Sequence, residues 1–192
     1  MFNIFNKSNK TERSIYFKPE LYINSVELNV SNYPDIEKQI QLIQLTKEDL
    51  AILKQLQPEA ERFIPTMVNQ FYESVTLSDH LTNIINEHSK VERLKVTLTK
   101  HLSDIFDSKI NSQYIENRKV IAAAHVRIGL ESKWYLSSFQ SLMTTFINFM
   151  DELDIARSEA TKAIEAFSKI INFEQQLVIQ AYEWEQERIR KE

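Results

Sequence analysis

The sequence predicts an all-α fold, and composition and periodicity both support it. The 192 residues include one glycine and four prolines, so the chain has few of the residues that tight β-hairpin turns require. Hydrophobic residues make up 43% of the chain and recur at helical intervals along most of it. A chain of this length can form one main domain that encloses both a hydrophobic core and a sizeable ligand.

The composition also excludes several functional classes. A single glycine cannot form the glycine-rich loop of a P-loop nucleotide hydrolase or of a Rossmann dinucleotide-binding enzyme. Without cysteine the chain can form no disulfide, thiolate zinc site, iron–sulfur cluster or thioether-linked cofactor. A formal net charge of −4 gives no basic field for nucleic acid. The N-terminus shows neither a signal-peptide core nor a membrane-spanning run, so we expect a cytoplasmic protein.

The first elements are predicted from caps and prolines. Residues 1–32 are polar and irregular, and we expect a loosely held N-terminal arm there. A short amphipathic helix is predicted over 35–45. Thr46 is expected to cap the next helix, and Pro58 to open a third one as a first-turn proline. Pro65 falls inside that third helix and is expected to bend it.

The middle of the chain predicts two further helices. A short connecting helix is predicted over 78–87. Ser89 and Glu92 have the spacing of a capping box, and a clearly amphipathic helix should start there. Thr97 lies at the edge of its apolar stripe, where such a hydroxyl usually bonds to its own helix backbone. His101 borders the stripe, and we interpret it as a hydrogen-bonded structural histidine.

One histidine lies within the apolar stripe of a predicted helix that ends at the only glycine, Gly129. His125 shares a helical face with Ile121 and Ile128, so its imidazole should point inward, whereas Arg118 points elsewhere. An inward imidazole can be a hydrogen-bonded core side chain or an axial ligand of a heme iron. The spacing alone favours the core histidine.

Two long helices are predicted at the end of the main domain, over 133–153, with Ser132 as its cap, and over 160–182. Both carry more apolar residues than one buried face needs. This surplus fits a dimer in which the helices of two copies form a four-helix bundle, and it equally fits a plain core. Residues 183–192 form a charged helical tail.

Several separated segments together resemble the globin-coupled sensors. In chain order they are LQPEAERFIPTMVNQFYESV, INEHSKVERLKVTLTKHL, IAAAHVRIGLESKWYLSSFQ and FEQQLVIQAY. The resemblance covers residues 33–182 and is greatest to the sensor domains of bacterial heme-based aerotaxis transducers. It implies a globin-like helical sandwich that encloses non-covalent heme b with O2 as its ligand. It also makes residues 183–192 a linker toward an output module.

The resemblance implies roles for four residues around the iron. His125, in the motif HVRIGL, would be the proximal iron ligand. Tyr72, in the FY pair, would be the distal residue that hydrogen-bonds bound oxygen, although a tyrosine hydroxyl often reaches a backbone carbonyl or the surface instead. Thr97 and Leu94 would line the distal side as a second polar contact and an apolar gate.

Three aromatic residues complete the implied site. Tyr135, in the motif KWY, would be a proximal residue whose hydrogen bonding changes with the ligand state. Phe71 and Trp134 would be apolar neighbours of the heme or of an interface. No catalytic residue is implied.

The implied function is an oxygen sensor for aerotaxis. Heme and a diatomic gas would be its ligands, and the two C-terminal helices would pass gas binding to a signalling module or to chemotaxis proteins. The sequence fits a sensor fragment and a stand-alone sensor globin equally well. A heme-free globin-like interaction module of a stress-signalling regulator is the alternative. A heme enzyme has no support, because no flavin site, nicotinamide site or acid–base pair stands out.

Overall fold

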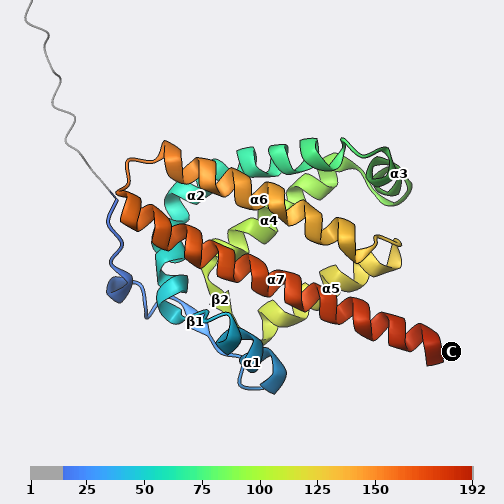
Figure 1. Ribbon diagram of the computed structural model, residues 1–192, viewed down its shortest axis with the longest axis horizontal. Helices are drawn as coiled ribbons and strands as arrows, with labels where there is room; N and C mark the ends of the chain where they lie inside the picture. The colour runs from blue at the N-terminus through green and yellow to red at the C-terminus, as the bar shows by residue number, and fades with distance from the viewer. Residues whose placement is uncertain (1–14, 192) are drawn as a thin grey trace, which may run out of the picture.

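The computed structural model describes residues 15–191, and the predicted all-α class is confirmed there (Figure 1). The elements, in chain order, are η1 (Pro19–Leu21), β1 (Glu27–Leu28), α1 (Pro34–Leu42), α2 (Lys47–Val75), α3 (Asp79–His88), α4 (Val91–Asp107), β2 (Lys109–Ile110), α5 (Ser112–Arg127), α6 (Ser132–Glu152) and α7 (Arg157–Lys191). The two short strands form one parallel pair. No helix within residues 15–191 has the length and apolar character needed to cross a bilayer.

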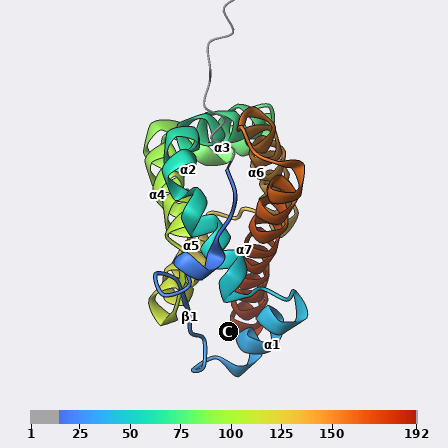
Figure 2. The same cartoon turned by 90° about the vertical axis from the view of Figure 1, so that its left-hand side faces the viewer.

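The helices form two layers, in agreement with the predicted helical sandwich. Figures 1 and 2 show α6 and α7 side by side in one layer, with α4 and α5 in the layer behind them. The long helix α2 contacts α4 as well as α6 and α7, and α5 contacts α7. The core between the layers contains Phe106, Phe146 and Phe167, whose rings pack on one another and are fully buried.

One helix of 29 residues, α2, stands where two helices were expected around Pro58. Pro58 and Pro65 both lie inside it, so the prediction that Pro58 opens a helix is wrong. The apolar stripe explains the difference, because it continues through both prolines. Leu56, Ala60 and Ile64 are buried in succession along one face. Packing of this face against three other helices outweighs the hydrogen bonds that the prolines remove.

The predicted cap is confirmed at Thr46, and the caps predicted at Ser89 and Ser132 are wrong. The Thr46 hydroxyl accepts a hydrogen bond from the Asp49 backbone N–H, and the Asp49 carboxylate accepts one from the Thr46 N–H. Ser89 instead ends α3, where its N–H donates to a backbone carbonyl of that helix. Ser132 is the first residue of α6, and Glu131 occupies the capping position without a side-chain cap bond.

The described part of the N-terminal arm packs on the helices, so the prediction of a loose arm is wrong for residues 15–32. Phe17, Val26 and Val30 are buried, and β1 pairs with β2. Val26, Leu28 and Val30 alternate with polar residues, which is the pattern of a short strand and was the available signal. The remainder of the predicted arm, residues 1–14, lies outside the described residues.

Candidate functional site

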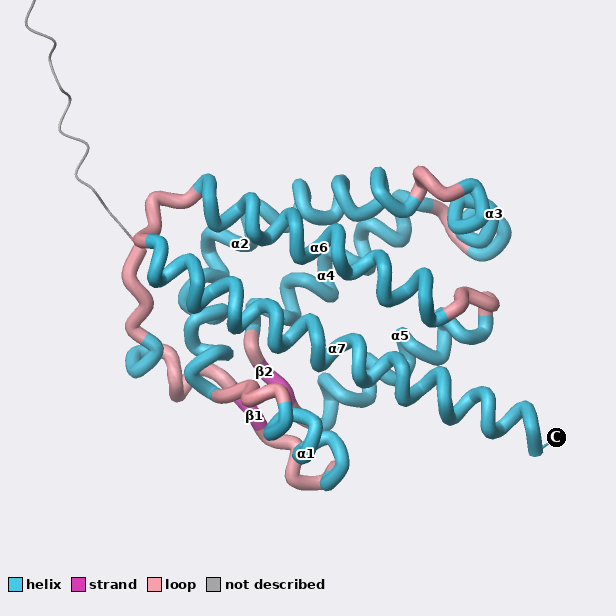
Figure 3. The backbone as a smooth tube through the Cα atoms, in the orientation of Figure 1, coloured by secondary structure: helices cyan, strands magenta, loops and turns pink. Residues whose placement is uncertain are grey.

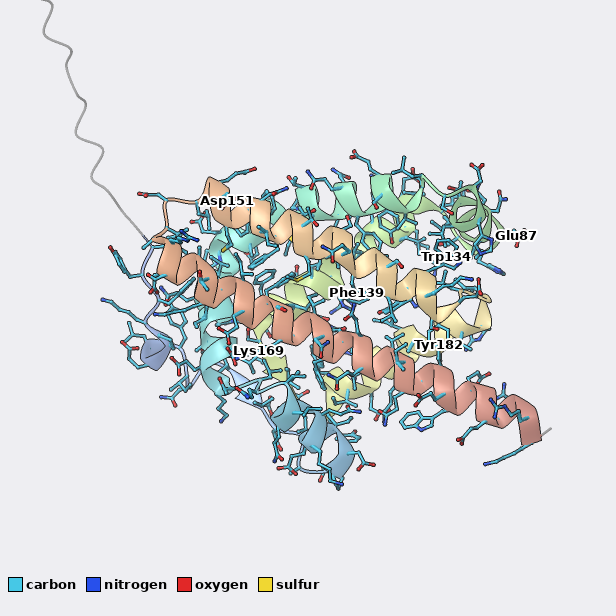
Figure 4. The ribbon with its side chains drawn as sticks, viewed as in Figure 1. Glu87, Trp134, Phe139, Asp151, Lys169 and Tyr182 are labelled. Carbon is cyan, nitrogen blue, oxygen red and sulfur yellow. The ribbon has the colours of Figure 1, made fainter. Side chains whose placement is uncertain are left out.

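An apolar cavity of about 190 Å³ lies among α2, α3, α4, α5 and α6. Its wall brings together all seven residues to which the resemblance assigns roles. They are Phe71, Tyr72, Leu94, Thr97, His125, Trp134 and Tyr135. Figure 4 labels Trp134 at the end of α6 that lies toward α3, and Phe139, another wall residue, further along the same helix. Residues that are far apart in the sequence therefore form one enclosure.

His125 lies in the last turn of α5, at the wall of this cavity. Its Nδ1 lies 2.8 Å from the backbone carbonyl oxygen of Ile121 and donates a hydrogen bond to it. Nε2 then carries the free electron pair, and no described residue donates a hydrogen bond to it. Burial lowers the pKa of His125, against the opposing effect of the Ile121 carbonyl, and keeps the imidazole neutral.

These features of His125 fit the proximal ligand of a heme. A neutral imidazole binds iron through the nitrogen that holds no proton, and a hydrogen bond from the other nitrogen fixes the tautomer and the orientation of the ring. The lining of the cavity is predominantly apolar, as the binding of a flat apolar macrocycle requires. The donor atom and its surroundings are therefore both suitable for heme.

The sequence around His125 sets the end of α5. Gly129 adopts a left-handed conformation with φ of 74°, as the helix-ending glycine predicts. The short loop that follows leads into α6, as Figure 3 shows. Leu130, in that loop, lines the cavity, and its carbonyl accepts a hydrogen bond from the Tyr182 hydroxyl of α7. The loop beside the candidate ligand is thus attached to the C-terminal helix.

Tyr72 supplies a hydroxyl group to the wall of the cavity from α2. The side chain is buried, and burial raises its pKa to about 12, so the hydroxyl keeps its proton at neutral pH. Within residues 15–191 this hydroxyl has no hydrogen-bond partner, so it does not reach the backbone carbonyl that was the alternative to the distal role. The neighbouring Phe71 packs edge-on against the Tyr72 ring, with the ring centres 5.1 Å apart.

The two predicted site residues on α4 are less buried than Tyr72. Thr97 is exposed, and its hydroxyl donates a hydrogen bond to the Arg93 carbonyl in its own helix at 3.3 Å. This is the backbone hydrogen bond that the sequence offered as the alternative to a role in the site. Leu94 is half-buried one turn earlier. In this arrangement Tyr72 offers a free donor to the cavity, whereas the Thr97 hydroxyl is already bonded.

The aromatic pair at the start of α6 occupies two different environments. Tyr135 is buried, and its ring centre lies 5.0 Å from that of His125. Burial, with the nearby Glu174 charge, raises the pKa of Tyr135 well above its usual range. Trp134 is half-buried and donates from Nε1 to the Glu131 carboxylate at 3.1 Å. Of the two aromatic residues, Tyr135 is therefore the one that packs against His125.

Sequence reasoning did not assign the short helix α3 to the cavity. Leu81, Ile84 and Ile85 contribute to the wall, although no residue of α3 is fully buried. In the sequence these apolar residues of α3 had no partner to pack against, and that was the available signal that they line a cavity. His101 of α4 also reaches the wall, and it is a buried histidine whose Nε2 lies 3.1 Å from a carboxylate oxygen of Glu174.

Comparison with known proteins supports the fold and identifies the family. The globin domain of the Geobacter sulfurreducens globin-coupled sensor superimposes with a TM-score of 0.70, over 76% of this chain and 96% of that chain. The two sequences are 22% identical, so this likeness shows the shared globin fold alone. The family model described as Protoglobin matches residues 32–188, which is most of the chain. The chain therefore belongs to the Protoglobin family.

Proposed function

We propose that this chain is a heme-based oxygen sensor domain that binds heme b through His125 and passes gas binding to its C-terminal helices. The observation that carries the proposal is the neutral His125, whose Nε2 is free at the wall of an apolar cavity. The function belongs to aerotaxis signalling, with a signalling module or chemotaxis proteins as the recipients. No catalytic step is assigned.

The residues of the cavity have distinct tasks in this proposal. When bound, ferrous heme b supplies an open coordination position for a diatomic gas. His125 would hold the iron, and the Ile121 carbonyl fixes the tautomer of its imidazole. The protonated Tyr72 hydroxyl donates to a gas that carries partial negative charge. Such a hydrogen bond contributes about 1–3 kcal/mol, which corresponds to roughly ten- to a hundredfold in affinity.

The proposal includes a homodimer formed through α6 and α7. Leu136 and Ile147 of α6 are apolar and more than a third exposed, so α6 presents apolar surface to the solvent. Figure 1 shows α6 and α7 side by side on one face of the molecule, where a second copy can pack to form a four-helix bundle. In that bundle α7 would carry the signal toward the charged segment at its C-terminal end.

Absorption spectroscopy of the purified protein tests the proposal. We expect a Soret band in air, a shift to a five-coordinate ferrous form after anaerobic reduction, and a stable new form when oxygen is readmitted. We expect these changes because His125 would be the one side chain that holds the iron, which leaves the iron able to bind a gas. A protein that shows no Soret band after heme is supplied would contradict the proposal and support the heme-free interaction module.

Replacement of Tyr72 by phenylalanine is expected to keep heme and to speed oxygen release. The variant loses only the hydroxyl donor, so the release rate should rise by roughly ten- to a hundredfold. Stopped-flow mixing of the oxygenated protein with dithionite measures that rate. Tyr16→Phe is the matched control, because Tyr16 is exposed and does not line the cavity. Equal rates in wild type and Tyr72→Phe would remove Tyr72 from the oxygen site.

A further inference from the structure

A cluster of charged and polar side chains lies buried between three helices, and the proposed function does not use it. Glu174 of α7 has no exposed surface, and Arg118 of α5 is 2% exposed. Tyr114 of α5 and His101 of α4 complete the cluster, and both are also buried. Buried charges are costly unless they are paired, so this arrangement needs a physical explanation.

One of the two Glu174 carboxylate oxygens has its hydrogen bonds made. This oxygen, Oε1, accepts a hydrogen bond from Nε of Arg118 at 2.7 Å and another from the Tyr114 hydroxyl. The Arg118 guanidinium also lies over the Tyr114 ring, 4.2 Å from its centre, and approaches Asp104 to 3.7 Å. These contacts fix α7 to α5, the helix that carries His125.

The other oxygen, Oε2, lies close to His101 but forms no hydrogen bond with it. Nε2 of His101 lies 3.1 Å from Oε2 of Glu174, but its N–H does not point at the oxygen. Within residues 15–191 no donor makes a hydrogen bond to Oε2, and Nη2 of Arg118 also has no acceptor. A small rotation of the His101 ring would complete the bond to Oε2. The rotated ring would differ from the observed one by one buried hydrogen bond.

His101 belongs to two environments at once. It lines the same cavity as His125, and it is the only member of the cluster that does so among the described residues. Its ring is thus within reach of whatever fills the cavity, while Nε2 remains beside the carboxylate of α7. A change at the cavity that turns this ring changes the bonding of a buried group on the C-terminal helix.

We infer that Glu174 is a positioning residue that sets the orientation of His101 in the cavity wall and thereby links the cavity to α7. The inference rests on the proposed heme function. Linkage between two sites is reciprocal, so gas binding should alter α7, and loss of the Glu174–His101 contact should alter gas affinity. A purely structural ion pair would show neither effect.

Hydrogen exchange of the α7 backbone tests the link, measured on the ferrous, heme-loaded protein with and without carbon monoxide. In wild type, carbon monoxide should change the exchange of amides around Glu174. His101→Leu removes the contact and should abolish that difference and shift carbon monoxide affinity by about two- to thirtyfold. Glu174→Gln should act likewise, because an amide NH2 replaces Oε2 while its oxygen still serves Arg118. His101→Gln keeps an N–H donor and should retain the wild-type behaviour.

The control is Asp49→Asn, which breaks a different contact of α7. Asp49 of α2 pairs with Lys169 of α7 at 3.1 Å, and neither residue lines the cavity. This variant should keep the carbon monoxide effect on α7. If wild type takes up no heme, the proposed function fails and the inference with it. If heme and carbon monoxide bind and α7 exchanges identically with and without the gas, or if His101→Leu retains the difference, only the inference fails.

Discussion

His125→Ala is expected to lose nearly all of its heme during purification. The substitution removes the imidazole whose Nε2 is free at the cavity wall. His101, the other histidine of the wall, already contacts Glu174 and lies on a different helix. Loss of an outer partner of a metal ligand costs roughly ten- to a hundredfold in metal affinity, so loss of the ligand itself should exceed about a hundredfold. The ratio of Soret to protein absorbance measures the loss.

Two controls separate ligand loss from misfolding. His80→Ala should purify with as much heme as wild type, because His80 is exposed and does not line the cavity. Free imidazole added to His125→Ala should restore the Soret band, because it can occupy the space that the side chain left. A His125→Ala protein that keeps a full complement of heme would show that another residue binds the iron.

The fold was predictable where local signals and burial agree. Thr46 caps α2 together with Asp49, which lies only three residues further along the chain, so a local sequence motif predicts the cap. Pro58 was read as a helix start because local chemistry favours that position. The tertiary packing of α2 against α4, α6 and α7 decides otherwise, and no local signal reports it.

The residues that line the cavity could be predicted from the sequence, whereas the buried charged residues beside it could not. All seven residues implied by the resemblance line one cavity. Arg118 was correctly placed off the stripe of His125, but it is buried, because it meets a carboxylate 56 residues away on α7. Nothing in the helical pattern of α5 or α7 marks such a pair. A charged residue on a polar face is usually solvated, and only its distant partner makes burial possible.

Arg118→Met is expected to lower the free energy of unfolding by about 3–5 kcal/mol, because it leaves the fully buried Glu174 carboxylate without its cation. Urea unfolding followed by circular dichroism measures the loss. The double variant Arg118→Met/Glu174→Met should recover much of it, because two apolar side chains fill the space and no charge remains buried. A double variant less stable than Arg118→Met would show that the pair does not act as a unit.

The single variant Arg118→Met should also reverse the way in which Glu174 makes stability depend on pH. Burial alone would raise the pKa of Glu174, yet the Arg118 charge, followed by His101 and Tyr114, holds it well below the ordinary value of 4.5. The unfolded chain therefore binds the proton first, and the contribution of Glu174, complete above pH 4.5, is lost as pH falls toward the folded pKa. In Arg118→Met the largest effect that opposes burial is gone, so we expect burial to outweigh what His101 and Tyr114 still contribute, and protonation then relieves the buried charge. The stability difference between wild type and variant should thus narrow from pH 7 to pH 4, whereas a constant difference would mean that Arg118 acts through packing and not through its charge.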